Sequence, residues 1–232
     1  MPTTSPTLYE IRTSAYGLPV HLAAVGADPA ALEDARVRLA GLGRAWDADL
    51  PRLAARSGSV LDVEPETVLL VSLVRGGDVV TDRRHGRAGI DAGVLPDLLA
   101  LRGALAADLL VHELTRRGAE GACVDVGGDV HVSGASPRPG GWRLSAASPR
   151  GSLFGAVTLA GGALAGAHGG GGGIRSAFVT GAYAYAAKLL ALDALRLTRR
   201  DAEDRVRATG GSGLLVGRGA VWTVGPWGEL AA

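Results

Sequence analysis

The chain has 232 residues, of which 47% are hydrophobic and 20% charged, and its 24 basic and 23 acidic side chains leave a formal net charge of +1. This balance argues against a nucleic-acid module held by a basic face, and the apolar content argues against disorder. Cys123 is the one cysteine, which excludes an intramolecular disulfide and a cysteine-rich zinc site.

The first 94 residues predict a hairpin, two helices and a long loop. Residues 1–9 are expected to be a tail, before a single domain over 10–230 whose first turn is Tyr-Gly-Leu-Pro at 16–19. The apolar spacing predicts a helix over 28–48, started by Asp28 or Pro29. A short strand and a helix follow in 60–74, separated by Glu64-Pro65, and the polar, glycine-rich stretch 75–93 is interpreted as a loop.

The remainder predicts one long helix and then mostly strands. Apolar periodicity predicts a helix over 95–117, ended by Gly118. Strands are expected at 122–126, 130–134, 142–146, 153–159 and 177–180. The glycine-rich segment 161–173 is interpreted as a flexible loop, 183–197 as a helix, and 214–225 as a terminal hairpin turning at Gly217 and Gly219.

Strands and helices alternate irregularly, with several hairpins, so the predicted class is α+β, with a mixed or antiparallel sheet packed with helices. The chain shows no internal repeat and no apolar run long enough to span a membrane. The N-terminus lacks the charged and apolar regions of a secretory signal, so a cytoplasmic protein is the expectation.

The segment CVDVGGDVHVSG is the first candidate for chemistry. A Gly-Gly turn lets backbone N–H groups approach a ligand, and Asp125 or Asp129 beside it could bind a ribose hydroxyl or a metal. The alternative is an ordinary hairpin in which an aspartate caps the turn. The five histidines are scattered and do not pair at ligand spacing, so a histidine metal site is not indicated.

Taken together, several windows in collinear order resemble the ApbE family, the FAD:protein FMN transferases. AYGLPV is similar to the family's A-M-G-T-x-V, with Tyr16 in the methionine place. DLLALRGALAAD aligns on D-L-G-G-I-A-K-G-Y-A-A-D and keeps both end aspartates, Asp97 and Asp108. ACVDVGGDVHVSG then matches V-N-x-G-G-D-I-x-x-x-G, which brings in Gly127, Gly128 and Asp129.

The resemblance implies the ApbE fold and an enzyme that splits FAD and transfers FMN to a Ser/Thr hydroxyl of an acceptor flavoprotein. It also implies Mg²⁺, because phosphoryl transfer generally uses a divalent cation. The family's metal ligands fall on the Ala100 carbonyl and, in the late helix, on Ala184 for an aspartate and Lys188 for a threonine, with a one-residue shift left open. Lys188 would repel Mg²⁺, stand in for the cation against phosphate, or be an ordinary surface lysine.

Other family segments are altered. The family lysine of K-G-Y falls on Gly103, the H-H-I-I-D-P segment is replaced by the glycine run, and T-D-G-A-F-D-P survives only as a trace at Thr81-Asp82. Two hypotheses follow. Either Tyr16, Asp97, Asp108 and the Gly-Gly-Asp turn shape an FAD site that Lys188 or a poorly held Mg²⁺ completes, or the chain is an inactive member that binds a flavin, a nucleotide or a partner without turnover.

Overall fold

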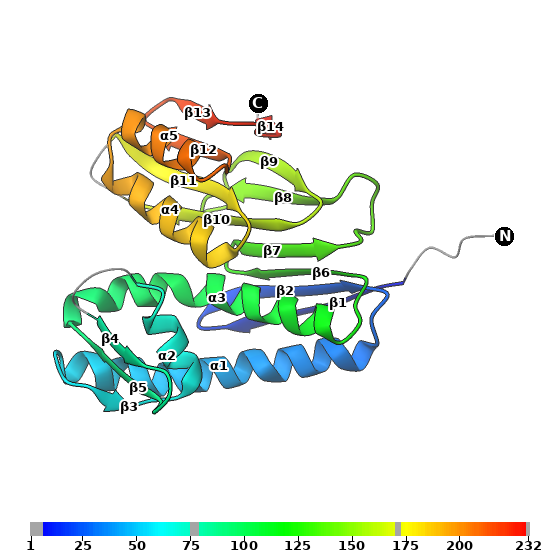
Figure 1. The fold of residues 1–232 in the computed structure, drawn as a ribbon. Helices are drawn as coiled ribbons and strands as arrows, with labels where there is room; N and C mark the ends of the chain where they lie inside the picture. The colour runs from blue at the N-terminus through cyan, green and yellow to red at the C-terminus, as the bar shows by residue number, and fades with distance from the viewer. Residues whose placement is uncertain (1–6, 75–78, 170–172, 231–232) are drawn as a thin grey trace.

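The computed structural model describes residues 7–74, 79–169 and 173–230, and a large antiparallel sheet runs through the molecule (Figure 1). Its strand order is β1-β2-β6-β7-β10-β11-β12-β13. These strands are β1 (Leu8–Ala15), β2 (Leu18–Val25), β6 (Gly121–Val126), β7 (Asp129–Gly134), β10 (Gly162–His168), β11 (Ile174–Gly181), β12 (Gly213–Gly217) and β13 (Val221–Val224). The predicted α+β class with an antiparallel sheet is confirmed.

Two three-stranded sheets flank this main sheet. The first has the order β14-β9-β8 and packs against one face of the main sheet through a shared apolar cluster. The second has the order β3-β5-β4 and lies beside the first helices (Figure 1). Their strands are β8 (Trp142–Ala147), β9 (Leu153–Leu159), β14 (Glu229–Leu230), β3 (Leu61–Asp62), β4 (Val79–Asp82) and β5 (Arg87–Ile90).

Helices cover the other face of the main sheet. They are α1 (Pro29–Ala55), α3 (Leu95–Arg116), α4 (Ala184–Arg196) and α5 (Arg199–Ala208). The helix α2 (Pro65–Val71) and the 3₁₀ turn η1 (Ala92–Val94) pack on α1 and α3. Helix α3 packs on β6 and β7, and α4 packs on β10 and β11. Among the described residues, no helix is long and apolar enough to cross a membrane.

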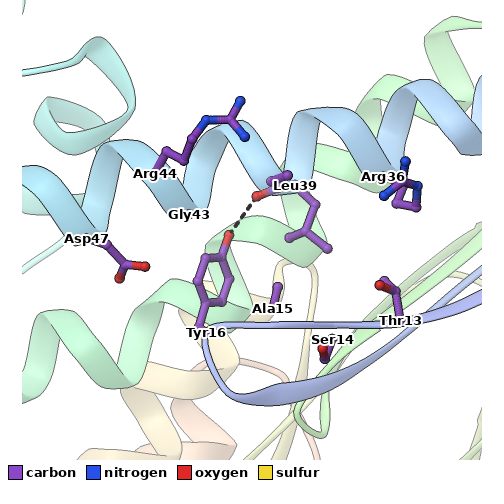
Figure 2. A pocket seen from close by; sticks show the side chains of 10 residues that line it. Thr13, Ser14, Ala15, Tyr16, Arg36, Leu39, Gly43, Arg44 and Asp47 are labelled. Atoms are coloured by element: carbon purple, nitrogen blue, oxygen red, sulfur yellow. Dashed lines mark hydrogen bonds between the residues drawn. The ribbon is translucent and has the colours of Figure 1, made fainter.

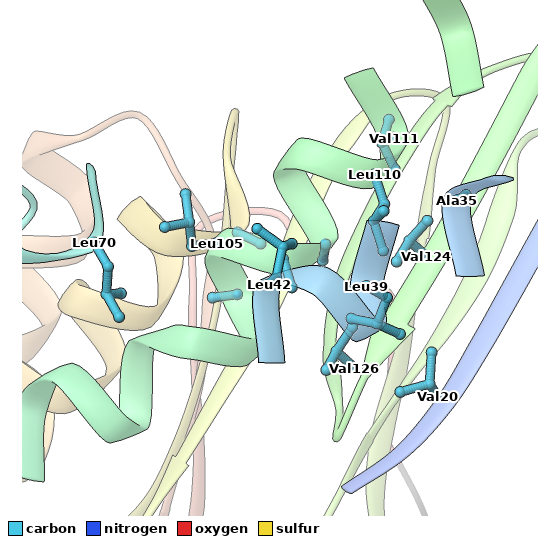
Figure 3. Close-up of a cluster of buried hydrophobic side chains, with 14 of the residues drawn as sticks. Val20, Ala35, Leu39, Leu42, Leu70, Leu105, Leu110, Val111, Val124 and Val126 are labelled. Carbon is cyan, nitrogen blue, oxygen red and sulfur yellow. The ribbon is translucent and has the colours of Figure 1, made fainter. Parts of the chain in front are cut away.

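The largest apolar cluster lies between the main sheet and helices α1 and α3 (Figure 3). Leu39 and Leu42 of α1 meet Leu110 of α3, and Val124 and Val126 of β6 form the floor. All five side chains are almost fully buried. Val124 and Val126 face the helices because every second side chain of a strand points to the same face. The same alternation decides which polar side chains of β6 and β7 face α3 and α4.

Most elements lie where the sequence predicts them, including the first hairpin. Tyr16 and Gly17 form its two-residue turn, with φ of 56° and 71°, and this pair of left-handed residues matches the twist of an antiparallel hairpin. The strand β1 begins at Leu8, inside the range expected to be a tail, while residues 1–6 lie outside the described residues. Helix α1 begins at Pro29 as predicted, with Asp28 accepting from the Ala30 N–H at 2.9 Å, but it continues to Ala55.

Two predicted loops are wrong in the described residues. Residues 79–82 and 87–90, inside the predicted loop 75–93, form β4 and β5, which are too short and polar to show a clear period. Residues 162–168, inside the predicted glycine loop 161–173, form the central strand β10. Its three alanines, Ala163, Ala165 and Ala167, alternate onto one face and are buried there, since small side chains let α4 approach this strand closely. The helix α5, over 199–208, was not predicted.

Candidate functional site

The turn between β6 and β7 directs two aspartates to opposite faces of the main sheet. Gly127 and Gly128 form it with φ of 66° and 91°, values that favour glycine. The Gly128 N–H donates to Asp125 Oδ1 at 2.7 Å, so Asp125 closes the turn. Strand alternation then places Asp129 on the face covered by α3 and α4, and Asp125 on the face toward β8.

Asp129 forms a buried ion pair with Lys188 of α4. Lys188 Nζ donates to Asp129 Oδ1 at 3.0 Å and to the carbonyl oxygen of Gly166 in β10 at 2.6 Å. The side chains are 13% exposed for Lys188 and 5% for Asp129, so Lys188 is not an ordinary surface lysine. Burial raises the pKa of Asp129 to about 6, because desolvation outweighs the opposing attraction of the Lys188 ammonium.

Asp108 joins three elements a short way along the same face. Its carboxylate accepts from the backbone N–H groups of Ala184 at 2.7 Å and Tyr185 at 3.0 Å, which begin α4. Asp108 Oδ1 also lies 2.5 Å from His131 Nδ1 of β7. The first N–H groups of a helix have no acceptor within the helix. The carboxylate of Asp108 in α3 is the acceptor for the first two N–H groups of α4.

The two aspartates belong to one group of side chains, which we call the buried charge layer and define as Asp108, Asp129, His131 and Lys188. Asp129 and His131 are two residues apart on β7 and face the same side. Lys188 follows Ala184, which binds Asp108, by one turn of α4. The layer therefore connects α3, β7, β10 and α4 through charged groups that all have partners.

Tyr16 lies at the other end of the predicted flavin site, on the β1–β2 turn. Its hydroxyl donates to the carbonyl oxygen of Leu39 in α1 at 3.3 Å (Figure 2). Its ring centre lies 5.6 Å from that of Trp46. The Arg102 guanidinium of α3 lies 5.1 Å from the ring centre and binds Asp47 at 2.8 Å. Burial raises the pKa of Tyr16 far above its usual value. A cavity of about 300 Å³ opens beside this tyrosine, between β1 and α1.

Asp97 and Ala100 lie near the start of α3 and have other surroundings. Asp97 Oδ1 binds the exposed Arg196 of α4 at 2.8 Å. Asp97 also lines a cavity of about 440 Å³ whose walls come mainly from α4 and α5, Tyr185 among them. Ala100 is inside α3, where its carbonyl oxygen accepts the N–H group four residues on. The structure thus brings together Asp108, the Gly-Gly-Asp turn and Lys188, but gives Asp97 a separate partner.

The residues at this site do not fit the Mg²⁺ that the resemblance implies. Mg²⁺ requires oxygen ligands in near-octahedral geometry, usually with one or two carboxylates. Ala184 offers no side-chain ligand and is fully buried, and the Lys188 ammonium occupies the neighbourhood of Asp129 and the Gly166 carbonyl. Within the ranges that the structure describes, no three His, Cys, Asp or Glu side chains group to hold a metal ion.

Sequence reasoning missed three features of the site: His131, the Gly166 carbonyl, and the lack of space for a side chain at position 103. The alternation of DVHVSG places His131 on the same face as Asp129, and this signal was sufficient to find it. A Cβ at Gly103 would lie 2.9 Å from the Val126 carbonyl oxygen and 3.3 Å from Asp129 Oδ2. The family's lysine therefore has no room at Gly103 in this chain.

Comparison with known proteins identifies the family and agrees with the fold. The ApbE family model matches residues 52–168, while curated protein sequences give no significant match. The structure of the ApbE protein of Thermotoga maritima superposes with a TM-score of 0.80 at 16% identity, covering 94% of this chain and 97% of that one.

Two further solved structures are similar over nearly their whole length. The apo flavinyl transferase ApbE of Pseudomonas stutzeri gives a TM-score of 0.75 at 13% identity, covering 97% of this chain and 98% of its own. The flavin transferase ApbE of Vibrio cholerae gives 0.73 at 13% identity, covering 95% and 98%. Since the family model covers half of the sequence and the fold agrees throughout, the chain belongs to the ApbE family.

Proposed function

We propose that the protein is a FAD:protein FMN transferase. In this reaction the hydroxyl oxygen of an acceptor Ser or Thr attacks the FMN phosphorus of FAD, and the bond between that phosphorus and the bridging oxygen breaks. AMP leaves with the bonding electrons, and the hydroxyl proton is released. The acceptor is a flavoprotein carrying a D-x-x-T-G-A-[ST] segment, as the family resemblance implies.

One observation carries this proposal. The segments that resemble the family's substrate-binding motifs lie far apart in sequence, yet Asp108, Asp129 and Lys188 meet in the buried charge layer. Gly127 and Gly128 precede Asp129 in the turn, and Gly128 has open space where a Cβ would lie, so a ligand can come close to the backbone there. Tyr16 and Asp97, at two separate cavities, are the proposed contacts for the rest of FAD.

A second function has specific support: an inactive family member that binds a flavin or a partner without turnover. The late helix lacks the aspartate and the threonine that the resemblance implies as metal ligands, since Ala184 and Lys188 stand in their places. Asp82, the trace of the family's flavin-holding segment, accepts from the backbone N–H groups of Arg84 and His85 and thus closes the β4–β5 turn. We propose no step through a metal, and cytoplasmic localisation stays an expectation.

The test is a flavinylation assay with the purified chain, FAD and an acceptor domain containing the D-x-x-T-G-A-[ST] segment. We expect covalent flavin fluorescence on the denatured acceptor, a mass increase of one FMN, and release of AMP in equal amount. The matched control is the same acceptor with alanine in place of its hydroxyl residue, which must stay unlabelled. If FAD binds but no acceptor is labelled with or without Mg²⁺, the inactive member is the correct function.

A further inference from the structure

Lys188 is unusual for a lysine in this chain. It is the one lysine among 24 basic side chains, and its side chain is only 13% exposed. An ammonium has three N–H donors, and the described residues accept two of them, through Asp129 Oδ1 and the Gly166 carbonyl oxygen. One donor of a buried, oriented cation therefore remains for another acceptor.

The Lys188 ammonium contacts the same oxygen atoms that a divalent cation would bind at this position. Asp129 and the Gly166 carbonyl supply the kind of oxygen atoms that a cation binds, and Lys188 Nζ already contacts both. An ammonium is a compact point charge, unlike the planar guanidinium found at the other basic positions of the chain, and it suits a single phosphate oxygen beside two fixed acceptors. The nearby His168 is affected as well, since burial and then the Lys188 charge lower its pKa.

The buried pair is not sealed completely. The Lys188 side chain is 13% exposed, and the exposed His168 lies close enough for the Lys188 charge, after burial, to lower its pKa. The backbone of Gly103 in α3 packs closely on Asp129, since a Cβ at Gly103 would lie 3.3 Å from Asp129 Oδ2. The N–H groups of Gly127 and Gly128 already donate to the Pro19 carbonyl oxygen and to Asp125 Oδ1, so the ammonium is the donor that remains for a phosphate.

We propose that the Lys188 ammonium replaces the divalent cation in this chain, so that the diphosphate of FAD binds without a metal. This inference deepens the proposed function and rests on it for the identity of the diphosphate. Asp129 and Gly166 hold the ammonium in place, and the third N–H donates to a phosphate oxygen. The lost metal ligands are then a substitution of one cation for another and not an erosion of the site.

Calorimetric titration of the EDTA-treated protein with FAD, ADP and riboflavin tests this inference. We expect FAD and ADP to bind with affinities that change less than about twofold on addition of Mg²⁺. Lys188→Met should weaken both by about tenfold or more, as expected for loss of a charge-assisted hydrogen bond. Riboflavin has no phosphate, so its affinity should be unchanged in this variant.

Two further variants separate the cation from the fold. Lys188→Met with Asp129→Asn removes the ammonium without leaving a buried carboxylate unpaired, and it should lose FAD and ADP affinity as the single variant does. Arg207→Met removes one exposed positive charge from α5 and should leave all affinities unchanged. Thermal unfolding of each variant shows whether it is folded at the titration temperature.

The outcomes distinguish the two proposals. If the wild type flavinylates its acceptor but requires Mg²⁺ to bind FAD, or if Lys188→Met binds FAD normally, the lysine inference is wrong and the transferase stands. If ADP binds without metal through Lys188 but no acceptor is labelled, the inference stands and the transferase function fails. If neither FAD nor ADP binds in either condition, both are wrong.

Discussion

The two faces of the main sheet at the β6–β7 turn carry the same residue type in different settings. Asp129 faces α3 and α4, is nearly sealed from solvent, and has a lysine held against it. Asp125, four residues earlier, faces β8 and lines a cavity of about 490 Å³ together with His21 and Cys123. Strand alternation alone separates them, because a two-residue turn sends the two aspartates to opposite faces.

The difference lies in what holds each carboxylate. Asp125 accepts from the Gly128 N–H and faces His21 across the β2–β6 pair. Burial raises the pKa of Asp125, and it raises the pKa of Cys123 to about 12. No lysine is fixed against Asp125 in the part of the chain that the structure describes. One face thus presents a cation oriented by two acceptors, and the other presents the partly exposed side chains of Asp125 and His21 along a cavity wall. The comparison teaches that burial of a carboxylate alone does not distinguish the two faces, whereas the presence of an oriented cation does.

Removing the Lys188 ammonium should have the largest effect on the free energy of unfolding. Lys188→Met leaves Asp129 as an unpaired buried carboxylate, and we expect a loss of about 3–5 kcal/mol in the free energy of unfolding at pH 7. Urea unfolding followed by circular dichroism measures it. The double variant with Asp129→Asn should recover more than half of the loss. If the single variant is as stable as the wild type, Lys188 and Asp129 are not paired in solution.

The second prediction concerns pH. The pKa of Asp129 is raised from 3.8 to about 6, so between these values the folded protein keeps a proton that the unfolded chain has lost. Stability should therefore fall as pH rises from about 4 to about 6, by on the order of 2–3 kcal/mol. Comparing the urea unfolding of the wild type and Asp129→Asn across this range isolates the contribution of Asp129. Equal pH slopes for the two proteins would contradict the prediction.

Asp108 should matter somewhat less. Asp108→Ala removes the partner of two N–H groups at the start of α4 and of His131, and we expect a loss of about 2 kcal/mol. Amide hydrogen exchange should show the change concentrated in the first turn of α4. Asp97→Ala is the matched control, because Asp97 is also on α3 but pairs with the exposed Arg196, and it should cost under about 1 kcal/mol.

The sequence was sufficient for the fold class and for most of the elements. Hydrophobic period and turn residues locate the first hairpin and the long helices, and the collinear windows select Asp108 and Asp129, which both contact residues of α4. Their assignment to FAD stays a prediction. The hydrophobic period and the turn residues predict these elements because each pattern depends on residues close together in the chain.

The rest could not be predicted, because it depends on packing between distant segments. Lys188 and Asp129 are 59 residues apart, and their pairing requires α4 to lie on β10. That strand is built from glycine and alanine, whose composition is typical of a loop, and its regularity comes from its neighbours β7 and β11. With β10 interpreted as a loop, the Gly166 carbonyl had no place in a predicted site.

The smallest expected effect is on the far face of the sheet. Asp125→Asn keeps an oxygen for the Gly128 N–H and removes a carboxyl whose pKa is raised by burial, so the free energy of unfolding should change by less than about 0.5 kcal/mol. FAD and ADP affinities should also be unchanged, since Asp125 orients no cation. Asp129→Asn, in contrast, weakens the hold on Lys188 and should reduce both affinities. Equal losses of FAD affinity in the two variants would show that the turn, and not the charge on the helix-covered face, determines binding.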